Sequence, residues 1–294
     1  MKPAPFRYDD PETMDEALAI LAAEPDDTFL LAGGQSLIPM LNLRLARPAR
    51  LVDINRIAEL NHIQERDGTL CIGALTRQRA VERSPLVAAR APLLAEAIAH
   101  VGHPAIRVRG TVGGSLAHAD PAAELPVACL ALGAVVHVRS AARGPRAIPG
   151  RELFLTHFTT ALEPDELLCA VDVPVDPPGA GTAFVEFARR HGDFALGGAA
   201  ARVTLNPDGS CARVDLALLG AAPTPVLATD AAAGLVGQPI DEKAAEEAAH
   251  AAIRDASPPD DMHASAAYRR RVIATMVERA LRLASQRASH RERP

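Results

Sequence analysis

The 294 residues are enough for two or three lobes with substantial cores, and the chain carries a net charge of −5. That acidic balance, with aromatic residues at 3% and no tryptophan, argues against a nucleic-acid partner, which requires basic side chains and stacking platforms. Because no apolar run approaches the length of a membrane span and no signal sequence opens the chain, we expect a cytoplasmic protein.

The four cysteines lie far apart in the sequence, at Cys71, Cys129, Cys169 and Cys211. Zinc sites and iron–sulfur clusters usually draw their ligands from closely spaced cysteine pairs, and the sequence contains no such pair. Each thiol stands among apolar neighbours, where cysteine behaves as a small hydrophobic side chain. We therefore expect four buried thiols and no metal site in this chain.

The first part of the chain alternates helical and strand patterns. An Asp-Pro pair predicts the start of a helix over 10–23, and an apolar strand over 28–31 follows. Ser36 is expected to cap a helix from 37 to about 45, and residues 51–54 supply the next strand. Strand, helix and strand in this order predict a crossover unit with parallel strands.

The middle of the chain is expected to be mainly helical. The elements predicted there, in chain order, are a strand over 70–74, a short helix after Thr76, a helix over 85–100, a helix from Asp120 and Pro121 to Gly133, and a strand over 134–138. Pro126 should cost the last of these helices one internal hydrogen bond.

A cluster of turn-forming residues near position 178 predicts a domain boundary. Its members are Pro174, Pro177, Pro178, Gly179 and Gly181. Beyond it, the turn sequence at 206–209 predicts a hairpin between strands over 199–205 and 212–219. Two helices, over 242–255 and 264–285, are expected to end the chain.

Two short glycine runs say most about function: Ala-Gly-Gly-Gln-Ser at 32–36 and Gly-Thr-Val-Gly-Gly-Ser at 110–115. Small residues allow backbone N–H groups to approach an anion, so the pair predicts a cradle for one pyrophosphate. Neither run has the P-loop or Rossmann pattern, which disfavours a nucleotide triphosphatase. The spacing alone leaves adenine dinucleotides, phosphosugars and coenzyme A open as ligands.

The amino-acid sequences of segments 31–39 and 106–121 closely resemble those of the FAD-binding medium subunit of molybdenum hydroxylases. This family includes carbon monoxide dehydrogenase and xanthine dehydrogenase. The likeness continues, in order, through segments 166–168, 189–195 and 267–269. It implies an α+β fold of the PCMH-like FAD-binding type. Its parts would be an N-terminal βαβ FAD-binding lobe (1–55), a second FAD-binding lobe (56–177) and a C-terminal α/β flavoprotein domain (178–294).

The resemblance assigns FAD contacts to the two runs, with Asp120 meeting ribityl or flavin N–H groups, Leu167 packing near the flavin, and Phe194 covering its ring. The full set it implies is Leu31, Ala32, Gly33, Gly34, Gln35, Ser36, Leu37, Gly110, Thr111, Val112, Gly113, Gly114, Ser115, Asp120, Leu167 and Phe194. It assigns no catalytic side chain. Ser115 stands where many relatives have Asn, and Glu186 where some have Lys, so the sequence does not identify the electron acceptor.

The same resemblance implies an electron-transfer subunit. Electrons would arrive from [2Fe-2S] clusters on a small partner subunit, after oxidation of a substrate at a molybdenum-pterin centre on a large one, and FAD would pass them to an external acceptor. A dimer of heterotrimers is expected. Two alternatives stay open: a self-contained FAD-dependent oxidoreductase and a non-redox nucleotide-binding scaffold.

Overall fold

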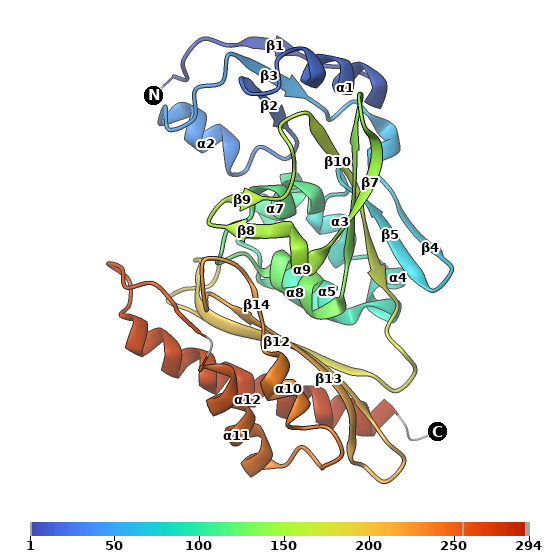
Figure 1. Cartoon of the computed structure of the whole chain (residues 1–294), viewed down its shortest axis with the longest axis vertical. Helices are drawn as coiled ribbons and strands as arrows, with labels where there is room; N and C mark the ends of the chain where they lie inside the picture. The colour runs from blue at the N-terminus through green and yellow to red at the C-terminus, as the bar shows by residue number, and fades with distance from the viewer. Residues whose placement is uncertain (1, 255, 292–294) are drawn as a thin grey trace.

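The computed structural model describes residues 2–254 and 256–291, which form three parts stacked along the long axis of the molecule (Figure 1). The N-terminal part has a parallel sheet in the order β1-β3-β2. Its elements are β1 (Arg7–Asp9), α1 (Met14–Ala23), β2 (Thr28–Leu31), α2 (Leu37–Asn42) and β3 (Arg50–Asp53). Because β2 and β3 pair in parallel across α2, the predicted crossover unit is confirmed.

Two helix boundaries of this part differ from the prediction. Helix α1 begins at Met14 because Thr13 and Glu16 form a capping box, each side chain accepting from the other's backbone N–H. The predicted start at the Asp-Pro pair is therefore wrong. Ser36 has helical backbone angles, and its side chain accepts no capping hydrogen bond, so the predicted cap is wrong. Helix α2 ends at Asn42 instead of about 45.

The middle part is an antiparallel sheet in the order β4-β5-β10-β6-β7. Its strands are β4 (Ile63–Arg66), β5 (Thr69–Gly73), β6 (Val135–Ser140), β7 (Gly144–Pro149) and β10 (Glu166–Pro174). The helices are η1 (Ala58–Leu60), α3 (Gln78–Glu82), α4 (Pro85–Arg90), α5 (Pro92–His100), α6 (Pro104–Arg109), α7 (Val112–His118), α8 (Glu124–Leu132) and α9 (Gly150–Leu153). A small two-stranded sheet, β8 (Phe154–Thr156) and β9 (Thr159–Thr160), lies beside α7 (Figure 1).

Prolines explain two corrections in the middle part. The helix expected over 85–100 is two helices, because the backbone at Ala91 leaves the helical region (φ −145°, ψ 62°) and Pro92 starts α5. Pro126 lies in the first turn of α8, where N–H groups have no partner within the helix, so it costs no internal hydrogen bond.

Asp120 does not start α8, which begins at Glu124. Its carboxylate instead accepts a hydrogen bond from the backbone N–H of Ala122 at 2.8 Å, within the turn that joins α7 to α8. Gly133 ends the helix with a left-handed φ of 69°, as the sequence predicted.

The C-terminal part is an antiparallel sheet in the order β11-β12-β13-β14, covered by long helices (Figure 1). The elements are β11 (Gly181–Ala188), β12 (Ala195–Leu205), β13 (Cys211–Leu219), β14 (Val226–Leu227), α10 (Thr229–Ala233), α11 (Glu242–Ala252) and α12 (Ala266–Arg291). The predicted hairpin joins β12 to β13. Helix α11 ends at Ala252, while Asp255, the predicted end, lies outside the described residues; α12 runs past the predicted end at 285.

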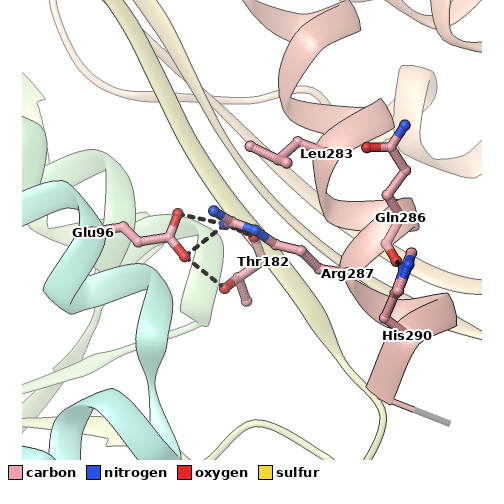
Figure 2. A pocket seen from close by; sticks show the side chains of 6 residues that line it. All are labelled: Glu96, Thr182, Leu283, Gln286, Arg287 and His290. Carbon is pink, nitrogen blue, oxygen red and sulfur yellow. Dashed lines mark hydrogen bonds and ion pairs between the residues drawn. The ribbon is translucent and has the colours of Figure 1, made fainter. Parts of the chain in front are cut away.

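The C-terminal part is fastened to the middle part at Glu96 of α5 (Figure 2). Arg287 of α12 donates through Nη1 to both Glu96 carboxylate oxygens at 2.8 Å, and to the Thr182 carbonyl at 2.5 Å. The backbone N–H of Phe184 also donates to Glu96, at 3.2 Å. One carboxylate thus ties a helix of the middle part to the first strand and last helix of the C-terminal part.

The architecture confirms the α+β fold class. The hydrophobic core is in three clusters: one around α1, β3 and η1, a large one around the middle sheet and its helices, and one between the C-terminal sheet and its helices. The middle cluster also takes in Phe184, Ala200 and Leu219 from the C-terminal sheet. Apolar packing therefore supplements the polar link at Glu96.

Candidate functional site

A cavity of about 680 Å³ lies where β2 and α2, the helices of the middle part and the turn before β12 meet. Its volume is typical of cofactor pockets. Of the residues implicated by the sequence, those on its wall are Ala32, Gly33, Gly34, Gln35, Ser36, Leu37, Gly110, Thr111, Gly113, Gly114, Ser115, Asp120, Leu167 and Phe194. Two segments about eighty residues apart in sequence therefore line one pocket.

Two residues of the predicted set are not on the wall. Val112 is fully buried in the core of the middle part. Leu31 ends β2, and its carbonyl accepts from the backbone N–H of Ile54 at 3.1 Å. Both residues therefore belong to the structure that supports the two glycine runs, and neither lines the cavity.

The first glycine run offers unused backbone donors. In the described part of the chain, no protein group accepts a hydrogen bond from the backbone N–H of Gly34, Gln35 or Ser36. Gly34 has φ 71°, a left-handed conformation that suits glycine and turns the chain into α2. The Gln35 side chain donates back to the Gly33 carbonyl at 3.0 Å, which stiffens the loop. This run has the geometry of an anion-binding nest.

The second run is built differently, because its own backbone donors are used inside the protein. The N–H of Val112 donates to the Thr76 carbonyl at 3.0 Å, that of Gly113 to the Ala74 carbonyl at 2.9 Å, and that of Gly114 to Thr111 Oγ1 at 3.1 Å. The N–H of Gly110 likewise donates to the Ile106 carbonyl at 2.7 Å, and that of Ser115 to the Thr111 carbonyl at 3.2 Å. The expectation that both runs present free amides is therefore wrong for Gly110 and for residues 112–115. What this run contributes is a close backbone surface and the Ser115 side chain.

Two side chains that the sequence analysis did not identify, Arg77 and Asn55, join the two glycine runs through hydrogen bonds, and we call this link the strap. Arg77 donates from Nη1 to the Arg109 carbonyl at 2.6 Å and from Nη2 to Asn55 Oδ1 at 2.7 Å. Asn55 in turn donates to the Ala32 carbonyl at 2.8 Å. Neither residue carries a sequence pattern that would have marked it, because the contact forms only when three segments meet.

Two buried polar atoms on the pocket wall lack partners. Thr28 Oγ1 and Gln78 Oε1 make no hydrogen bond with any described residue. A buried polar group without a partner costs about 1–3 kcal/mol, so a polar ligand that supplies the missing partners fits this pocket. The free backbone N–H groups of the first run favour a ligand that carries an anionic group.

The far end of the pocket is more apolar and partly covered. Leu167 of β10 is 1% exposed and lies against the core of the N-terminal part, whereas the Phe194 side chain at the mouth is 68% exposed. Phe194 is thus a surface side chain over the pocket instead of a core residue. Val101 and Gly102 also line this end, and Arg107 holds their carbonyls through Nη1 at 2.9 and 3.1 Å.

Glu124, the first residue of α8, is a pocket residue that the sequence reasoning missed. Its side chain is buried, and burial raises the pKa of its carboxyl to about 8, with the nearby Glu186 adding to the shift. The available signal was a single acidic residue at the head of an otherwise apolar helix, Glu124–Leu132.

The cysteines are all free thiols, and burial raises the pKa of Cys129 to about 12. Cys71 and Cys169 are only partly buried, so the prediction of four buried thiols is correct for Cys129 and Cys211 alone. Within the described residues, no group of three or more His, Cys, Asp or Glu side chains is arranged to bind a metal ion. No described helix is long and apolar enough to cross a membrane.

Comparison with known proteins agrees with this geometry. Residues 4–176 match the family described as "FAD binding domain in molybdopterin dehydrogenase", and residues 182–284 match "CO dehydrogenase flavoprotein C-terminal domain". The chain is 47% identical, over all of its length and 98% of the relative's, to the 6-hydroxypseudooxynicotine dehydrogenase complex subunit alpha of Paenarthrobacter nicotinovorans.

Solved structures match over nearly the whole fold. A carbon monoxide dehydrogenase chain from Hydrogenophaga pseudoflava superposes with a TM-score of 0.95 at 39% identity, covering 98% of this chain and 99% of that one. Quinoline 2-oxidoreductase from Pseudomonas putida 86 gives a TM-score of 0.94 at 38% identity, with the same coverage. The chain therefore belongs to the FAD-binding medium-subunit family of the molybdenum hydroxylases, as a flavoprotein subunit of a molybdenum-containing oxidoreductase.

Proposed function

We propose that this chain holds FAD in the pocket between its three parts and passes electrons from a partner subunit to an external acceptor. The amides of Gly34, Gln35 and Ser36 bind the pyrophosphate, while Thr111 and Ser115 face it from the second run. The observation that carries this assignment is a nest of free N–H groups strapped to a second glycine run on one cavity wall.

Three further pocket residues, Asp120, Leu167 and Phe194, are assigned roles in this proposal. Asp120 accepts hydrogen bonds from the ribityl or flavin groups, Leu167 packs against the ring, and Phe194 covers it. FAD supplies the redox chemistry when bound. The chain orients it, excludes water from the Leu167 side, and limits access from solvent through the Phe194 side.

Partners complete the electron path in this proposal. A small subunit with [2Fe-2S] clusters delivers electrons that a large molybdenum-pterin subunit takes from the substrate, and the complex is a dimer of heterotrimers in the cytoplasm. The names of the relatives support this assignment, since one is a subunit of a dehydrogenase complex and one similar solved structure is that of a Cu,Mo-CO dehydrogenase. We also propose domains over 1–55, 56–177 and 178–294. The presence of three core clusters supports a division into three parts, although the first cluster also takes in Ile57, Leu60, Leu75 and Leu167.

The test is purification of the chain together with the products of its neighbouring genes. A complex of three subunit types whose absorption combines flavin and iron–sulfur bands, and whose flavin is reduced when substrate is added, is the expected result. A control complex with Gly33→Ala should keep the iron–sulfur absorption and lose flavin.

Other outcomes would contradict the proposal. Turnover of an organic substrate by the isolated chain would indicate a self-contained oxidoreductase. Bound FAD that dithionite reduces but no partner complex reduces would indicate a scaffold. Purified chain that stays colourless with excess FAD would exclude the site itself.

A further inference from the structure

The turn between β11 and β12, residues 189–194, extends from the C-terminal part to the cofactor pocket. Strand β11 ends at Ala188 and β12 begins at Ala195, so this turn is the tip of an antiparallel hairpin. Gly192 and Phe194 of the turn lie on the pocket wall, together with residues of the other two parts. The position of the turn therefore decides where Phe194 lies over the pocket.

The turn is closed by interactions of its own. The backbone N–H of Asp193 donates to the Arg190 carbonyl at 3.1 Å, and Arg189 Nη2 lies 3.6 Å from Asp193 Oδ2. Gly192, between Arg190 and Asp193, has φ 86°, a conformation that a residue with a side chain adopts only with strain. Because these interactions join its two ends, a contact that holds Gly192 also holds Phe194.

His103 is the residue of the middle part against which the turn packs. A Cβ built on Gly192 would lie 2.5 Å from Cε1 and 2.7 Å from Nδ1 of His103, so any side chain at position 192 would have to displace this ring. The His191 ring packs edge-on against the same ring, with centroids 6.0 Å apart and an interplanar angle of 64°. Two neighbouring residues of the turn thus approach one histidine.

The segment that carries His103 is itself firmly held. His103 precedes α6, and its carbonyl accepts from the backbone N–H of Ile106 at 2.8 Å. Arg107, buried in the same helix, donates to the carbonyls of the two residues before His103, and its Nε donates to Glu82 of α3 at 2.9 Å. The imidazole therefore meets the turn from a well-anchored element of the middle part.

We propose that His103 is a positioning residue that holds the 189–194 turn in place and thereby keeps Phe194 over the flavin pocket. The inference rests on the proposed function, because it takes the pocket to hold FAD. His103 is not on the pocket wall, so it acts on the cofactor only through the turn. When this contact is lost, Phe194 leaves the pocket mouth more often, and small electron acceptors reach the flavin more rapidly.

The first test uses the absence of tryptophan from the sequence. Phe194→Trp places the only tryptophan of the chain in the turn, and its fluorescence anisotropy reports how firmly the turn is held, with no FAD present. Adding His103→Ala should lower the anisotropy, because the ring contact is gone, and His103→Phe, which restores an aromatic ring, should return it to the starting value. His250→Ala, at an exposed position on α11, is the matched control and should leave it unchanged.

The second test follows re-oxidation of the FAD-loaded, dithionite-reduced chain by ferricyanide in a stopped-flow instrument. His103→Ala should raise the rate about fivefold, which corresponds to about 1 kcal/mol, the size of one ring contact. In a Phe194→Ala background, His103→Ala should change the rate no further, because the side chain that it positions is already missing. A role of His103 in stability alone would give the same increase in both backgrounds.

Two results would overturn the inference and leave the proposed function standing. One is an equal anisotropy of the Phe194→Trp chain with and without His103, and the other is an equal increase in re-oxidation rate in the two backgrounds. A chain that binds no FAD would instead overturn the proposed function. The anisotropy would then still decide whether His103 holds the turn.

Discussion

Gly33 and Arg109 belong to different glycine-rich segments, yet a Cβ built on Gly33 would lie 2.5 Å from the Arg109 carbonyl oxygen. It would also lie 2.9 Å from Cα of Gly110. Atoms this close on two backbones leave no room for a methyl group, so the two runs touch through main chain alone. This contact sets the spacing of the two runs on the pocket wall.

Gly33→Ala should therefore separate the two runs and lower FAD affinity by at least about tenfold, or about 1.4 kcal/mol. Equilibrium dialysis with FAD measures the loss. Gly234→Ala is the control, because a Cβ there meets nothing closer than 3.6 Å and φ is −63°. Equal affinity in both variants would show that the runs do not clamp the cofactor.

Phe194→Ala should change access to the flavin without disturbing the fold. The residue is 68% exposed, so removal of its ring should alter the free energy of unfolding by no more than about 0.5 kcal/mol. Re-oxidation of the reduced protein by small acceptors, followed by stopped flow, should become faster. Met262→Ala, at an exposed position away from the pocket, should leave the rate unchanged; an unchanged rate in Phe194→Ala would remove Phe194 from the proposed gate.

Glu96→Gln should loosen the junction between the middle and C-terminal parts. The Arg287 side chain is 42% exposed and that of Glu96 28%, so the expected loss is about 1 kcal/mol. Urea unfolding measures it. The more exposed pair Arg151 and Glu152, with side chains 72% and 57% exposed, supplies a comparison, since Glu152→Gln should cost about 0.5 kcal/mol at most. Matching midpoints for the two variants would mean that the junction depends on apolar packing instead.

Asp261 predicts an acid-sensitive contact in the C-terminal part. Its hydrogen bond from Arg269 holds the pKa of Asp261 at about 2, below the value of about 3.9 expected for the unfolded chain. A depressed carboxyl pKa stabilises the fold above the unfolded value, and this stabilisation is lost as pH falls from about 4 to about 2. Thermal unfolding should show Asp261→Asn less stable than wild type at pH 6, with the difference shrinking over that interval. A difference independent of pH would contradict the ionic origin.

Local patterns were sufficient for the elements that depend on neighbouring residues. The hairpin at 206–209 and the crossover through α2 are confirmed because turn residues and apolar runs specify them within a few positions. The Thr13 capping box was also readable in the sequence, but the Asp-Pro pair pointed to an earlier start. Of these two local signals for a helix start, the capping box determines where α1 begins and the Asp-Pro pair does not.

Features that depend on distant segments were not predictable. The place of β10 between β5 and β6 depends on pairing with strands far away in sequence. The contacts of Arg77 likewise join residues far apart in sequence. The glycine runs were found because their composition is unusual. Amides of the second run donate to the carbonyls of Ala74 and Thr76. These hydrogen bonds depend on how the folded chain places the two segments, so the sequence did not predict them.

The strap through Arg77 and Asn55 bears on the order of events when the subunit matures. Its hydrogen bonds run between protein atoms only, so both walls of the pocket are positioned before any nucleotide arrives. Insertion of FAD then needs little reorganisation of the polypeptide, and the entropic cost of docking is reduced accordingly. We therefore expect the two walls of the pocket to stay joined in the apoprotein, so that FAD binding does not have to bring them together.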